Sequence, residues 1–115
     1  MIDRYVMLRD LVGFAKPINE LRGLLGTFKW DFDGIPLTMT RKHFRDVIER
    51  YMKGEISSQD IEDWANLIEG REDMTFESRD DNLLSEIVYE LANPELTEEL
   101  SYQRAKEIVD LLNKS

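Results

Sequence analysis

Apolar residues recur at helical spacing along most of residues 40–113. Between Thr40 and Gly54 the apolar positions fall three and four residues apart, a threonine hydroxyl is placed to cap the first turn, and a glycine follows the last turn. These signals predict a helix. The same pattern predicts three further helices, over about residues 57–70, 80–92 and 101–113.

The first forty residues carry a less regular pattern. Residues 2–15 are apolar on most sides, and a second apolar stripe follows Pro17, which suits the first position of a helix. In residues 28–39 apolar residues alternate on both sides of Asp33-Gly34, which is typical of a short β-hairpin. We therefore expect a mainly α fold, a compact bundle of five to six helices, with a short β-hairpin near residues 28–39 as an optional element.

The composition predicts one domain covering residues 1–115. Hydrophobic residues make up 42% of the chain, which supplies enough apolar surface for a core. The absence of cysteine excludes disulfides, thiolate nucleophiles and cysteine-ligated metals. No apolar run is long enough to span a bilayer, and the N-terminus lacks the apolar stretch of a signal peptide, so we expect a cytoplasmic protein.

The charge is distributed unevenly along the chain. The net charge is −9, but residues 1–50 hold 9 basic and 7 acidic residues, whereas residues 51–115 hold 6 basic and 17 acidic residues. A surface of this kind repels nucleic acid and anionic membranes, and it attracts a basic protein partner. The alternative is that the acidic residues only keep the chain soluble.

Motifs for catalysis and ligand binding are missing from the sequence. His43 is the only histidine, and no orienting partner or nucleophile accompanies it. Asp31 and Asp33 resemble the start of a calcium loop, but the glycine is misplaced and position twelve would be Lys42. The six glycines are scattered rather than gathered in a phosphate loop. We therefore expect no enzyme activity, no catalytic residue, no metal site and no cofactor.

Acidic residues without basic neighbours mark the outer side of two predicted helices. On the helix near residues 80–92, Tyr89 lies almost opposite the apolar stripe and close to Glu86. A tyrosine exposed among carboxylates is typical of a protein-binding surface. The alternative is a tyrosine packed under residues 70–79. The predicted partner-binding residues are Glu62, Asn66, Glu69, Asp73, Glu86 and Tyr89.

Four neighbouring residues are expected to have structural roles instead. Trp64 lies on the apolar stripe of its helix and is predicted to be in the core. Met74 and Phe76 are the apolar members of a polar segment and are predicted to attach it to the core. Arg71 is surrounded by acids and is predicted to form an ion pair with a neighbouring carboxylate.

Residues 37–113 resemble a family of small, uncharacterised bacterial proteins. The resemblance rests on four short runs, at residues 54–57, 64–66, 71–73 and 90–96. Proteins of this size and charge are also loosely similar to the immunity proteins of bacterial toxin systems. That resemblance implies a protein that binds and masks a toxin.

Two functional hypotheses follow from these observations. The first is a non-enzymatic, acidic protein-binding module, of the immunity or antitoxin type, that masks a basic toxin. The second is a homodimeric structural or regulatory adaptor. It is motivated by the N-terminal segment, which is apolar on too many sides for a simple surface helix and so suggests a dimer contact.

Overall fold

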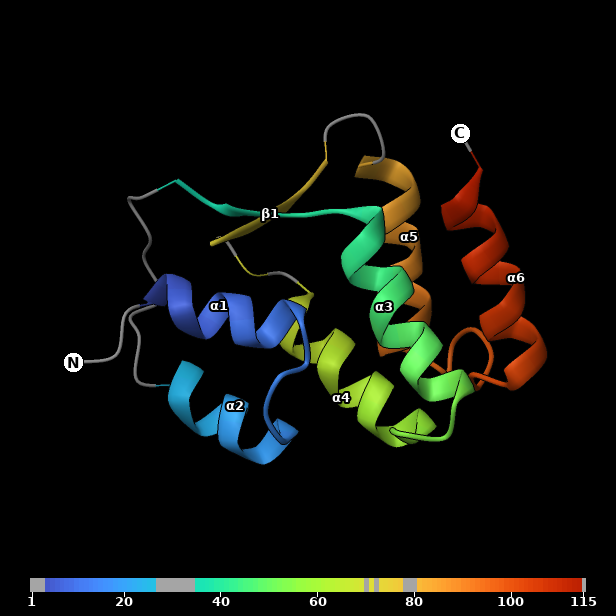
Figure 1. Cartoon of the computed structure of the whole chain (residues 1–115), viewed down its shortest axis with the longest axis horizontal. Helices are drawn as coiled ribbons and strands as arrows, with labels where there is room; N and C mark the ends of the chain where they lie inside the picture. Colours follow the sequence, from blue (N-terminus) through green and yellow to red (C-terminus); the bar gives the residue numbers. More distant parts are fainter. Residues whose placement is uncertain (1–3, 27–34, 70, 72, 78–80, 115) are drawn as a thin grey trace.

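The computed structural model of the chain describes residues 4–26, 35–69, 71, 73–77 and 81–114. Within these residues the chain forms six helices and two short strands (Figure 1). In chain order they are α1 (Arg4–Val12), α2 (Ile18–Leu25), β1 (Leu37–Met39), α3 (Arg41–Met52), α4 (Ser58–Ile68), β2 (Met74–Phe76), α5 (Asp81–Ala92) and α6 (Tyr102–Asn113). The predicted mainly α fold, a compact bundle of helices, is confirmed.

The four helices after residue 40 pack in two pairs. Helix α3 lies against α6, and α4 lies against α5 (Figure 1). Their buried side chains are the ones that the helical spacing selects, for example Phe44 and Ile48 on α3 and Trp64 on α4. The Phe44 and Trp64 rings meet edge to face, with centroids 5.7 Å apart, and this contact joins the two pairs.

Strand β1 is the second strand of the predicted hairpin, but its described partner is a strand that the sequence did not reveal. Leu37 lies opposite Met74 and Met39 opposite Phe76, in a parallel pair. The loop predicted at 69–79 therefore contains a strand. The first hairpin strand and the Asp33-Gly34 turn lie outside the described residues.

Helix α1 is enclosed on several sides, which explains its irregular apolar pattern. It packs against α2 and β1 (Figure 1), and Met7, Leu8, Leu11 and Val12 are all buried. The Trp64 indole Nε1–H donates a hydrogen bond to the Leu11 carbonyl over 2.6 Å, which attaches α4 to the end of α1. Trp64 is fully buried, as its position on the apolar stripe predicted.

Candidate protein-binding surface

Two of the predicted contact residues lie on one side of α4, and a third follows its last turn. Glu62 and Asn66 are four residues apart on the helix, whereas Glu69 is the residue after it, with a non-helical ψ of 127°. Asn66 and Glu69 are exposed and Glu62 is partly exposed. Glu62 and Asn66 lie outside the buried stripe of α4, which consists of Ile61, Trp64, Ala65 and Ile68.

Two further predicted residues lie on α5, the helix that packs against α4. Glu86 and Tyr89 are three residues apart and both are exposed, with 48% of Tyr89 accessible. The amide of Asn93 donates to Glu69 Oε2 over 3.3 Å and to the Tyr89 carbonyl over 2.9 Å, so the two helices meet here. We use the name acidic face for the exposed and partly exposed predicted residues carried by this pair of helices and the residue after α4, namely Glu62, Asn66, Glu69, Glu86 and Tyr89.

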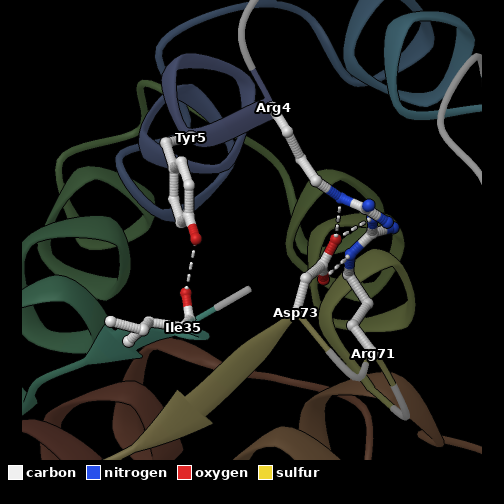
Figure 2. Close-up of polar contacts among 5 residues, drawn as sticks. All are labelled: Arg4, Tyr5, Ile35, Arg71 and Asp73. Carbon is white, nitrogen blue, oxygen red and sulfur yellow. Dashed lines mark hydrogen bonds and ion pairs between the residues drawn. The ribbon is translucent and has the colours of Figure 1, made fainter. Parts of the chain in front are cut away.

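Asp73 does not belong to the acidic face. Its side chain is only 2% exposed and lies between Arg4 and Arg71 (Figure 2). Arg71 bonds both carboxylate oxygens, over 2.8 and 2.9 Å, and Arg4 Nε bonds Oδ2 over 2.9 Å. The prediction that Asp73 lines a partner contact is corrected, because this carboxylate is buried and already satisfied within the chain.

The two arginines also control the protonation of Asp73. Burial by itself raises the pKa of the Asp73 carboxyl, but the hydrogen bonds and charges of Arg71 and Arg4 lower the pKa more, to below the ordinary 3.8. Asp73 is therefore ionised at neutral pH. The Asp73 carbonyl also accepts the Leu37 N–H over 2.9 Å, so this residue ties α1 to both strands.

A second contact joins α1 to the chain entering β1. The Tyr5 hydroxyl donates to the Ile35 carbonyl over 2.8 Å (Figure 2). Together with the Asp73 ion pairs, it fixes the start of α1 against the two-stranded sheet. These contacts have a structural role and lie apart from the acidic face.

A groove beside the acidic face was not predicted from the sequence. It lies between the first turns of α4 and the segment that links α5 to α6, and its volume is about 280 Å³. We call it the glutamate groove; its lining residues are Ser58, Gln59, Ile61, Glu62, Leu91, Pro94, Glu95, Glu98, Glu99 and Leu100. Glu62 belongs to both the groove and the acidic face. The only signal in the sequence was the density of glutamate after Pro94.

The nearby cation is engaged elsewhere. Arg104 of α6 forms a two-pronged ion pair with Glu90 of α5, over 2.6 and 2.7 Å. The hydrogen bonds that Arg104 donates to Glu90 raise the pKa of Arg104 above its ordinary value, although partial burial opposes them. Across the part of the chain that the structure describes, no ion pair reaches the four glutamates of the groove. The charge of Arg104 still acts on Glu98, which adds to the raised pKa of Arg104, but Arg104 forms no ion pair with Glu98.

His43 has a structural role in its helix. Its Nδ1 accepts the backbone N–H of Thr40 over 3.0 Å, in the position that glutamate or glutamine takes in a capping box. Burial lowers the pKa of the imidazole below 6.5, Lys42 lowers it further and Asp46 opposes them. The neutral ring is the form that this hydrogen bond requires.

Among the described residues, no three histidine, aspartate or glutamate side chains gather closely enough to hold a metal ion. None of the described helices combines the length and the apolar character needed to cross a bilayer.

No protein-family model, curated protein or solved structure matches the chain. The resemblance to small bacterial proteins and to toxin-immunity proteins stays a prediction.

Proposed function

We propose that this chain is a non-enzymatic module that binds a basic protein partner through its acidic face. The proposal is carried by one observation: α4 and α5 pack together and carry the partly exposed Glu62 and the exposed Glu86 and Tyr89, and no ion pair to either carboxylate is found among the described residues. Uncompensated charge accelerates the encounter with an oppositely charged protein. Tyrosine is enriched among the residues that contribute most to binding energy.

A toxin-masking role fits this surface as a specific form of the proposal. Nucleases that cut nucleic acid carry basic surfaces, because they must neutralise phosphates. An acidic protein that covers such a surface blocks access to the substrate. In this form the chain acts in the cytoplasm as an immunity protein or antitoxin, and the interaction with its toxin is strong at low salt and weaker at high salt.

The test compares charge reversals at matched positions. The chain is titrated against basic candidate toxins by calorimetry at about 50 mM and about 300 mM salt, concentrations at which the screening length differs about twofold. Glu62→Lys with Glu86→Lys is expected to weaken the complex about tenfold or more. The control, Glu20→Lys with Glu107→Lys, makes the same change in net charge at two exposed glutamates outside the acidic face.

Two results would contradict the proposal. One is the absence of any salt-sensitive complex with the basic candidates. The other is a complex that both double variants weaken equally, because net charge alone would then govern binding and the acidic face would have no special part.

The homodimeric adaptor remains the second candidate. The structure removes its original motivation, since the apolar sides of α1 are covered by α2, β1 and the residues around Trp64. Val6 is the exposed apolar residue of α1, with 46% of it accessible. Light scattering at high concentration distinguishes the two candidates, because a strict monomer rules out the adaptor.

A further inference from the structure

The glutamate groove combines an apolar floor with an acidic rim. Leu91, Pro94 and Leu100 supply apolar surface, and Glu62 on one side faces the glutamates of residues 95–99 on the other. Its volume of about 280 Å³ lies just below the range of pockets that hold whole small molecules. A long side chain with an apolar stem and a positively charged head matches both the volume of the groove and the chemistry of its lining.

The ends of two helices determine the sign of the charge that the groove favours. The C-terminal end of α5 carries the negative end of its dipole, and the last turn holds no basic residue. Its last carbonyls are satisfied by neutral donors: Asn93 bonds Tyr89, and Thr97 bonds Glu90. The negative end of the dipole therefore adds to the field of the glutamates.

The opposite helix end, the N-terminus of α4, offsets this field only in part. The N-terminus of α4 is closed by a reciprocal cap, in which Ser57 Oγ accepts the Asp60 N–H over 3.1 Å and Asp60 Oδ2 accepts the Ser57 N–H over 3.0 Å. Its amide groups are therefore less available to an anion, and they are shielded by a carboxylate. The α5 dipole and the glutamate side chains therefore favour a cation in the groove, and the Asp60 cap reduces the opposing effect of the α4 N-terminus.

We propose that the glutamate groove receives an arginine side chain projecting from the basic partner. The inference rests on the proposed function and names the contact that anchors it. The arginine stem lies along Leu91 and Pro94, and its guanidinium reaches the glutamates of the rim. Arginine suits the site better than lysine because its planar fork bonds carboxylates in pairs. Arg104 and Glu90 already form this arrangement a short distance away in the same fold.

The first experiment uses a defined probe instead of the partner. N-acetyl-arginine amide is titrated into the full-length, isotope-labelled chain at low salt, and backbone amide shifts are recorded. Millimolar binding is expected, with shifts concentrated at residues 58–62 and 91–100. N-acetyl-citrulline amide has nearly the same shape without the charge, and it is expected to leave these signals in place. Equal responses to both probes, or no response to arginine, would overturn the inference.

Variants then separate the groove from the rest of the surface. Glu62→Gln and Glu98→Gln are each expected to weaken arginine-amide binding about twofold to fivefold, the usual effect of one partly exposed charge pair. Glu20→Gln on α2 is the matched control and is expected to change nothing. If Glu98→Gln leaves the arginine shifts intact, the groove is not the binding site.

The same variants distinguish the failure of this inference from the failure of the proposed function. With a basic partner in hand, Glu98→Gln is expected to weaken the complex, as Glu86→Lys does. A complex that responds to Glu86→Lys and ignores Glu98→Gln would leave the proposed function standing and refute the arginine anchor. The absence of any complex, with arginine-amide binding retained, would refute the proposed function.

Discussion

At the scale of single residues, Asp73 is the carboxylate with the greatest structural effect. It is buried, it bonds Arg4 and Arg71, and its backbone holds β1. Asp73→Asn leaves two arginines beside a neutral amide, and removing one partner of a buried pair is costly. We expect the free energy of unfolding to fall by about 3 kcal/mol in urea titrations at pH 7.

The control for this prediction is Asp46→Asn. Asp46 forms an exposed pair with Lys42 on α3, and its loss is expected to cost about 0.5 kcal/mol or less. Because the folded pKa of Asp73 lies below 3.8, its stabilisation is complete above that pH and is lost as the pH falls below it. An Asp73→Asn variant as stable as Asp46→Asn would show that the ion pairs contribute nothing.

His43 gives a second pH-dependent prediction at this scale. Its folded pKa is lowered from 6.5, so the unfolded chain takes up the proton first. The stability that it contributes is therefore complete above pH 6.5 and is lost as the pH falls through 6.5 to the lower folded value. Glutamine in its place can accept the Thr40 N–H without titrating. We expect His43→Gln to reduce the pH dependence of the free energy of unfolding, measured from about pH 7.5 to 5. An unchanged slope would contradict this role.

The role of a residue could be predicted when its contact partners lie close to it in the sequence. The burial of Trp64 and the exposure of Tyr89 follow from position on a helix, and the structure confirms both. The ion pair of Arg71 is confirmed because its partner is two residues away. Arg4 is 69 residues from Asp73, and no local pattern indicates that contact. Asp73 was therefore wrongly placed on the binding surface.

At the scale of elements, helices were predictable and the sheet was not. The helix expected between Thr40 and Gly54 occupies Arg41–Met52, and the three later helices lie within two residues of their expected ends. Caps and apolar spacing involve only residues that are close in sequence, so they can be recognised without knowing the tertiary contacts. Strand β2 has only three residues, which is too short for an alternation of apolar and polar residues to reveal it. Its partner strand lies 37 positions away in the sequence, so no local pattern indicates the pairing. Met74 and Phe76 were nevertheless correctly predicted to contact the core.

Two glycines give a matched prediction about helix geometry. Gly54 follows α3 with a φ of 81°, a conformation that a side chain disfavours, so Gly54→Ala is expected to destabilise the chain by about 1 kcal/mol. Gly23 lies inside α2 with open space around it, and Gly23→Ala is expected to stabilise by about 0.5–1 kcal/mol. Thermal unfolding followed by circular dichroism measures both. Shifts of the same sign would contradict the argument.

At the scale of the whole molecule, folding concentrates the acidity that the sequence spreads over residues 60–99. Helices α4 and α5 bring residues more than 20 positions apart to one border, and the turn after α5 adds the glutamate groove. The excess of acid was visible in the sequence, whereas the groove depends on how that turn packs against α4. Arg104 was visible too, but only the structure shows that Glu90 engages it.

This arrangement predicts opposite effects of salt on stability and on binding. The net charge is −9, and the described residues form few exposed ion pairs, so repulsion among the surface carboxylates opposes folding. Raising sodium chloride from about 20 mM to about 0.5 M screens that repulsion, so the Tm is expected to rise by a few degrees. The buried Asp73 pairs are screened less and do not cancel the gain. Glu62→Lys with Glu86→Lys reduces the net negative charge and is expected to show a smaller rise. A Tm that falls with salt would mean that charge attraction within the folded chain outweighs charge repulsion. The acidic face would then lack the excess negative charge needed to attract a basic partner.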